Sequence, residues 1–349
     1  MATTRPSRAA QPAPAVRPVR AAERRARLAS EGRIEQRVYL AAAVVGIAVA
    51  LIVVAGIVLT VVLPPRSKVL TVGPRTFTAA DVAVRAKYAI AGESNRLVVS
   101  DPASIIPTLL REETLRQKAG HLGVSVTDEE LKAELRKRMG TAEGQPDEAF
   151  QTAYNRYLEI LPISRAQYEE IVSTAVLRTK VIEAFKATVP ATGPQLHLLA
   201  VAGPDRAKLE DMRTAVTSGK DFKSEAVARG LVTDPSRADL AWFDPASLPD
   251  RIARVRDLKA GETSEVILDT QSGSFFLAQV VERSEDRAYD DTVKGQVANR
   301  QFDEWVKSEE ASLGGTPSLS GTARAWVTRQ LKGTLADANR RAQAQQAPK

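Results

Sequence analysis

Histidine is the residue type whose position in this chain first suggests chemistry. The 349 residues contain two histidines and no cysteine. His197 lies at the centre of GPQLHLLAVAG, residues 193–203, an apolar run typical of a buried strand. A histidine there can be a core residue with one hydrogen-bond partner, or it can serve a site, because imidazole both donates and accepts. The sequence of the neighbouring segments is needed to choose between these two interpretations of His197.

Other signatures of known chemistry are absent from the sequence. It has no H-E-x-x-H, no G-x-S-x-G, no phosphate-binding glycine loop and no Cys/His spacing of a metal site. We therefore expect neither a metal nor a cofactor, and hydrolase and redox activities are disfavoured. The lack of cysteine also excludes a disulfide framework. The second histidine, His121, lies near an expected helix C-terminus, where a cation is favourable without any functional role.

The positive charge of the chain belongs to its N-terminus. The formal net charge is +7, and residues 1–37 contain nine arginines and three glutamates, so the rest of the chain carries +1. A nucleic-acid-binding domain would show its charge on a folded face, and we expect no nucleic-acid partner. Residues 1–37, rich in Ala and Pro, are expected to form a disordered basic tail.

Residues 38–63 form an apolar run of 26 positions without a charge. As a helix this run is about 39 Å long, longer than the roughly 30 Å hydrocarbon core of a bilayer. A cleaved signal peptide would have a shorter apolar region of about 7–15 residues, so we predict an uncleaved transmembrane anchor. Arginines are concentrated before the run. The positive-inside rule then places the N-terminus in the cytoplasm and the bulk of the chain outside the cell membrane, as a single-pass protein.

After the anchor, the sequence pattern changes along the chain from helix-like segments to a mixture of strand-like and helix-like segments. Thr78 followed by Asp81 marks the start of a first helix, and the turn QSG predicts a hairpin between the last two strand-like runs. The expected segments are a helical region at 68–190, an α+β unit at 194–285, a helix at 286–312 that packs on the helical region, and a segment at 313–349 with a linker, a helix that can form around Trp326 and a disordered tail. The predicted fold class is therefore α+β with a single N-terminal transmembrane helix.

Five sequence blocks in the 194–285 unit follow one another in a familiar order. They are HLLAV at 197–201, SGKDF at 218–222, DPS at 234–236, ADLAWF at 238–243 and LKAGETSEVI at 258–267. In this order the unit resembles the parvulin (rotamase) domain of peptidyl-prolyl isomerases, which implies a four-stranded sheet with surrounding helices. The segments VLTVGPRTFTAADV and LLREETLRQKAGHLGVSVTDEELKAEL, with the later QFDEW, resemble the helical chaperone region of membrane-anchored SurA- and PrsA-like foldases. The resemblance covers about residues 68–312.

The resemblance implies two catalytic positions. It places His197 at the floor of a proline pocket and Asp234 at the position where the family has Asp or Cys. Asp234 has an ordinary alternative, because Asp before Pro in TDPS is a common turn residue. The family's second histidine is replaced here by Phe276, which would leave His197 without its usual partner.

The resemblance also implies an apolar, substrate-binding surface. Leu248 and Ile252 correspond to the pocket wall, and Trp242, Phe243 and Phe276 are the other substrate-binding candidates. Simple core packing would also explain Leu248 and Ile252.

The chemistry implied is rotation about an X–Pro bond, which requires no covalent step. The barrier is about 18–20 kcal/mol, and an apolar pocket lowers it by excluding water and holding the proline ring. The sequence thus predicts a membrane-anchored extracytoplasmic folding factor, a prolyl isomerase with chaperone activity on unfolded or Pro-containing exported polypeptides. The alternatives are a catalytically degenerate holdase chaperone with the same fold and an envelope scaffold.

Overall fold

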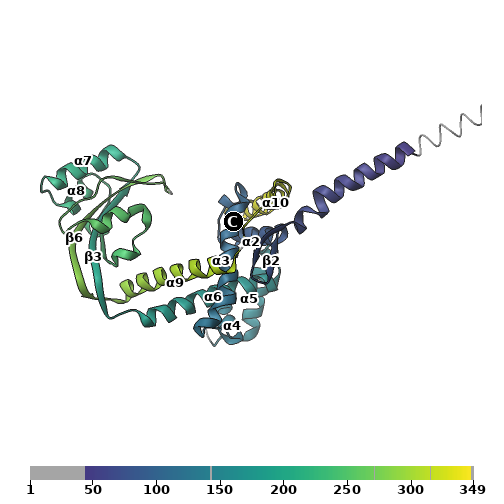
Figure 1. The fold of residues 1–349 in the computed structure, drawn as a ribbon, viewed down its shortest axis with the longest axis horizontal. Coiled ribbons are helices and arrows are strands. Elements are labelled where there is room, and N and C mark those ends of the chain that lie inside the picture. Colours follow the sequence, from purple (N-terminus) through teal and green to yellow (C-terminus); the bar gives the residue numbers. More distant parts are fainter. Residues whose placement is uncertain (1–43, 142–143, 271, 315, 347–349) are drawn as a thin grey trace, which may run out of the picture. The chain divides into compact units, whose positions relative to one another are not determined.

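A computed structural model describes residues 44–141, 144–270, 272–314 and 316–346. The chain divides into two compact units, residues 1–64 and residues 65–349. Figure 1 shows the ribbon. The tail predicted at 1–37, the first residues of the predicted anchor and the last three residues of the chain lie outside the described residues.

The described part of the first unit is an apolar helix. Helical residues run from Val44 to Arg66 with a mean hydropathy of 3.0, and none of the apolar stretch is buried. The helix winds as a π-helix (η1) over Val58–Val62. The hydroxyl of Thr60 donates to the carbonyl of Gly56 at 2.6 Å, so this polar side chain is satisfied within the helix. By length and composition the helix can cross a membrane.

The second unit opens with a hairpin that leads into its first long helix. Strands β1 (Lys68–Val72) and β2 (Arg75–Thr78) pair antiparallel around Gly73, whose φ of +52° suits a residue without a Cβ. Helix α2 (Ala79–Ala91) follows, and the amide of Thr78 donates to Asp81 at 2.7 Å, which is half of the capping box expected from the sequence.

Six further helices lie among the described residues in the helical part of this unit. They are α3 (Ile106–Lys118), α4 (Asp128–Arg138), α5 (Asp147–Ile160), α6 (Arg165–Thr188), α9 (Asp291–Leu313) and α10 (Gly321–Gln346), with short helical turns at η2 (Pro64–Arg66), η3 (Leu97–Val99), η4 (Pro102–Ile105) and η5 (Ala119–Leu122). Helix α9 packs against α6 and α3, and its Phe302 is fully buried there.

Helix α10 completes a core that begins at the other end of the unit. Ala323, Val327 and Leu331 are fully buried against side chains of β1, β2 and α2. Their spacing of four residues places them on one face of the helix. Within the segment predicted to hold a linker, one helix and a tail, residues 316–320 are not helical, and α10 runs from Gly321 to Gln346 with one face in the core.

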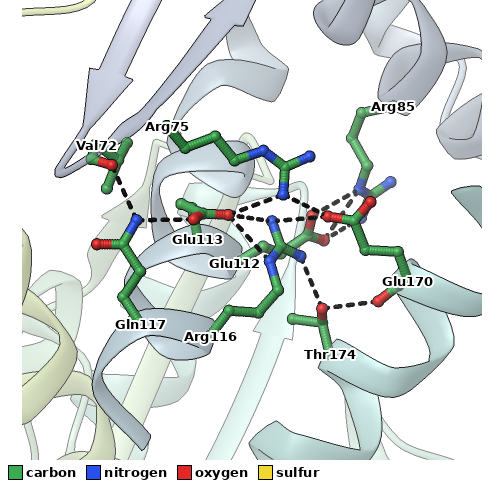
Figure 2. Close-up of polar contacts among 9 residues, drawn as sticks. All are labelled: Val72, Arg75, Arg85, Glu112, Glu113, Arg116, Gln117, Glu170 and Thr174. Carbon is green, nitrogen blue, oxygen red and sulfur yellow. Dashed lines mark hydrogen bonds and ion pairs between the residues drawn. The ribbon is translucent and has the colours of Figure 1, made fainter.

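A network of charged side chains ties the hairpin to two helices (Figure 2). Glu113 of α3 accepts from Arg75 at 3.1 Å, from Arg116 at 2.8 Å and from Gln117 at 2.7 Å. Arg75, next to the hairpin turn, also contacts Glu170 of α6 at 2.6 Å. The Glu113 side chain is 7% exposed, so the network brings these charges together in a site that is largely out of water.

The α+β part consists of a four-stranded antiparallel sheet and its covering helices. The strands are β3 (Thr192–Gly203), β4 (Asp239–Phe243), β5 (Ile267–Asp269) and β6 (Ser274–Ala288), and the helices are α7 (Arg206–Thr217), α8 (Phe222–Ala228), η6 (Pro235–Ala238), η7 (Pro245–Ser247) and η8 (Asp250–Asp257). The strand order is β4-β3-β6-β5. The mixed α+β class predicted from the sequence is confirmed.

Strand β3 lies between β4 and β6, and its side chains contribute to two separate hydrophobic cores. Leu199 and Val201 pack with α7 and α8, which cover one face of the sheet (Figure 1). Leu196, Leu198 and Ala200 pack on the opposite face, with Leu248 and Val255. This alternation follows from the two-residue period of a strand.

Candidate active site around His197

A bulge between β3 and β4 shapes the surroundings of His197. His197 pairs with Trp242, whereas Leu199 pairs with Asp239, so β4 has two residues, Leu240 and Ala241, where β3 has one. Ala241 has a φ of +61°, a left-handed conformation that is uncommon outside glycine. The bulge turns β4 locally and brings Asp239 alongside the imidazole.

The carboxylate of Asp239 joins His197 to helix α8. Its Oδ1 lies 2.8 Å from His197 Nε2 and accepts from the amide of Ala241 at 2.9 Å. Its Oδ2 accepts from Lys223 Nζ at 2.7 Å. An ionised carboxylate can only accept, so His197 Nε2 carries a proton and Nδ1 is the nitrogen left for another partner.

The electrostatics keep this carboxylate charged. Desolvation raises the pKa of Asp239, but the hydrogen bonds from Lys223, His197 and the Ala241 amide outweigh it and hold the pKa well below its ordinary value. The side chains of His197 and Asp239 are 23% and 26% exposed. The pair is therefore both fixed in place and open to solvent.

Trp242 forms an aromatic surface beside the imidazole. The two rings are stacked, with centroids 5.3 Å apart and planes at 25°. The guanidinium carbon of Arg287 lies 3.9 Å from the centroid of the Trp242 ring, a cation–π contact. The ring is thereby held against His197, and of the aromatic residues expected to bind substrate it is the one in contact with the histidine.

Asp234 does not contact His197. Its Oδ1 accepts from the amide and the hydroxyl of Ser236, each at 2.7 Å, and it caps η6. It thus has the turn geometry that its sequence context allows. The carboxylate beside His197 is Asp239, a residue that sequence reasoning missed, although ADLAWF placed it three positions before Trp242.

The apolar candidates gather on the other face of the sheet. Phe243, Leu248, Ile252 and Phe276 belong to one hydrophobic cluster with Leu196 and Leu198. His197 shares the face of Leu199, because side chains two apart on a strand point the same way. Residues that could together line a proline pocket are present, but on the face opposite the histidine.

Phe276 also lies away from His197 along the strand. It pairs with Ala202 of β3 and Ile267 of β5, whereas the partner of His197 on β6 is Glu282. Five strand positions, about 16 Å at 3.3 Å per residue, separate His197 from Ala202. Phe276 is therefore not the cross-strand neighbour of the histidine. Among the described residues no group of three or more His, Asp or Glu side chains could hold a metal ion.

Comparisons with known proteins give matches among solved structures. No family model and no curated protein matches the chain. It is similar to the peptidylprolyl isomerase PrsA of Bacillus anthracis, with 14% identity and a TM-score of 0.35, over 67% of this chain and 97% of that one. The foldase PrsA of Streptococcus pneumoniae matches with 12% identity and a TM-score of 0.34, over 76% and 99%. A structure described among SurA-like chaperones of Campylobacter jejuni matches with 14% identity and a TM-score of 0.24, over 70% and 93%.

Proposed function

We propose that the chain is an extracytoplasmic folding factor with a parvulin-type domain. The five sequence blocks that carry the resemblance fall on the elements of one sheet domain: HLLAV lies in β3, SGKDF spans the turn into α8, DPS lies at η6, ADLAWF covers β4 and LKAGETSEVI leads into β5. The observation that carries the proposal is the hydrogen-bonded His197–Asp239 pair, partly exposed on the first strand of that domain.

The location proposed for this activity is the outer side of the cell membrane. The apolar helix can serve as the anchor, and the arginines that precede it favour a cytoplasmic N-terminus. Residues 65–349 would then meet unfolded or Pro-containing exported polypeptides.

For isomerisation the pair would act by position rather than by covalent chemistry. Asp239 fixes the imidazole with its Nε2 proton toward the carboxylate, which leaves Nδ1 to form a hydrogen bond with a bound chain. Trp242 adds an apolar, rigid contact surface beside it. Such a surface removes water from one side of an X–Pro amide, and a less hydrated amide twists more easily because the twisted form is less dipolar.

The test is an isomerase assay on the full chain in detergent micelles, with a tetrapeptide that contains an X–Pro bond. We expect His197→Ala and Asp239→Asn each to lower kcat/KM by about tenfold, equivalent to about 1.4 kcal/mol. The matched control is Asp234→Asn, which keeps a capping side chain and should leave the rate unchanged. If Asp234→Asn lowers the rate and Asp239→Asn does not, the site is wrongly placed.

The second candidate function is a holdase that binds chains without isomerising them. It is favoured by the position of Phe243, Leu248, Ile252 and Phe276 on the sheet face opposite His197, because a proline ring bound among them would not touch the histidine. In that case the full chain suppresses aggregation of a denatured client equally well with and without His197→Ala, and neither protein accelerates isomerisation.

A further inference from the structure

A cavity of about 570 Å³ lies in the helical part, lined by residues of α2, α3, α4, α6 and α9. This volume is in the range of small-ligand sites. Part of the lining is apolar and comes from Tyr88, Leu110, Leu115, Ile171 and Phe302. The cavity is in a different part of the chain from His197, and the site described above does not use it.

Four arginines line the same cavity: Arg85, Arg111, Arg138 and Arg178. Arg85 is the most deeply buried, with a side chain 8% exposed. Its Nη2 contacts Glu93 and Glu112, each at 2.9 Å. Its Nη1 is buried and has no hydrogen-bond partner among the described residues, and Figure 2 shows this guanidinium bound to Glu112. A buried N–H group without an acceptor is costly, so Arg85 retains the capacity to bind an acceptor from a ligand.

Two more of these arginines each place their guanidinium group over the ring of Phe302. The guanidinium carbons of Arg111 and Arg178 lie 5.2 and 5.3 Å from the centroid of its ring. Arg111 has an ion pair with Asp303, but its Nε is buried without a partner. Arg178 forms no ion pair among the described residues. An anion in the cavity near these two side chains would be attracted by both guanidinium groups.

Two of the three acidic residues that line the cavity are paired with Arg85 and not with Arg111 or Arg178. Glu93 and Glu112 are bound to Arg85. Glu310 lies on α9 eight residues after Phe302, about 12 Å along the helix axis. Burial raises the pKa of Glu310 despite the charge of Arg111. Its carboxyl group can accept hydrogen bonds from the amides of a bound chain.

We propose that this cavity binds the free C-terminal carboxylate of a polypeptide, with an apolar last side chain. Arg178 and Arg111, whose guanidinium groups lie over the buried Phe302 ring, hold the carboxylate, and the partly exposed Leu110 and Ile171 contact the side chain. A carboxylate with two guanidinium donors forms charge-assisted hydrogen bonds, about twice as strong as neutral ones. The choice of a polypeptide as the ligand rests on the proposed function; the choice of a carboxylate rests on the arginines alone.

The experiment compares two short peptides on the full chain in detergent micelles. Acetyl-Gly-Ala-Leu with a free C-terminus and the same peptide as its C-terminal amide are titrated by calorimetry. We expect the free acid to bind at least about tenfold more tightly, and Arg178→Ala to bring the ratio close to one. The control is Arg206→Ala on α7, an arginine with a side chain 64% exposed and outside the cavity, which should keep the wild-type ratio. Circular dichroism checks that each variant is folded.

Two results would overturn the proposal. Equal binding of acid and amide by the wild-type chain, including no binding of either, shows that no carboxylate site exists. Tighter binding of decanoate than of the peptide acid shows that the ligand is a free amphiphile rather than a polypeptide. Neither result bears on isomerisation at His197, which is measured separately, and a chain without isomerase activity can still distinguish acid from amide.

Discussion

Replacing Glu113 by glutamine removes one charge from the network of Figure 2 and keeps the size of the side chain. Arg75 and Arg116 would then share Glu170 as their carboxylate partner, at 2.6 and 3.4 Å. Removing one partner of a buried ion pair costs about 3–5 kcal/mol. Arg75 is 40% exposed and keeps Glu170, so we expect the lower end of this range, about 3 kcal/mol in the free energy of unfolding.

The change should be visible as a lower thermal midpoint of the full chain in detergent micelles at pH 7. For a folded unit of this size, 1 kcal/mol corresponds to about 2–4 °C, so the expected shift is about 6–12 °C. The matched control is Glu304→Gln, because Glu304 is 63% exposed and pairs with Arg300 along one helix. Such surface pairs contribute about 0.3–0.5 kcal/mol, and the control should shift the midpoint by about 2 °C at most.

The same variant has a defined dependence on pH. Burial raises the pKa of Glu113, but the hydrogen bonds from Gln117 and Arg116 and the nearby charges outweigh it, so the pKa lies below its ordinary 4.5. Stabilisation from such a carboxylate is complete above the pKa of the unfolded chain and is lost as the pH falls through the pKa of the folded chain. The difference between wild type and variant should therefore be full at pH 7 and shrink below about pH 4.5. A midpoint indistinguishable from the control, or a difference that grows on acidification, would refute the reasoning.

Three further predictions concern other parts of the second unit. Leu331→Ala should lower the free energy of unfolding by about 2–4 kcal/mol, because the side chain is fully buried in the core shared with α2; a loss similar to that of an exposed leucine in a denaturant titration would contradict this. Ala241→Gly should raise the free energy of unfolding by about 0.5–1 kcal/mol, since the φ of +61° suits glycine better, and a lower thermal midpoint would show that the methyl group is needed. In a carbon-13 NMR titration, Asp239 should remain ionised at a pH where ordinary aspartates are half protonated, and Lys223→Met should raise its midpoint.

Local patterns in the sequence predicted the elements better than their mutual positions. The apolar run around His197 forms β3, and Thr78 starts a helix, because both depend on neighbouring residues. The carboxylate beside His197 depends instead on a bulge at Leu240 and Ala241. Nothing in the residue types reveals that an alanine adopts a left-handed conformation there, so Asp239 could not be chosen over Asp234 from the sequence.

Strand register and helix packing set similar limits elsewhere. Phe276 aligns with the position of a family histidine in sequence, yet its neighbour across the sheet is Ala202, and register is decided by both strands together. The buried face of α10 consists of Ala323, Val327 and Leu331. Their spacing in the sequence indicates one apolar helix face. It does not indicate that this face packs on α2, which lies more than 200 residues earlier in the chain.

The position of α10 has a consequence for the order in which the protein folds. The core of β1, β2 and α2 stays open until Ala323, Val327 and Leu331 have been synthesised, since these residues close it. A long intervening chain must be closed into a loop before the contact forms, and such non-local contacts slow folding. During synthesis from the N-terminus, the sheet domain is complete before its helical neighbour. A chain that stops short of α10 therefore presents an unfinished apolar core to the proteases around it.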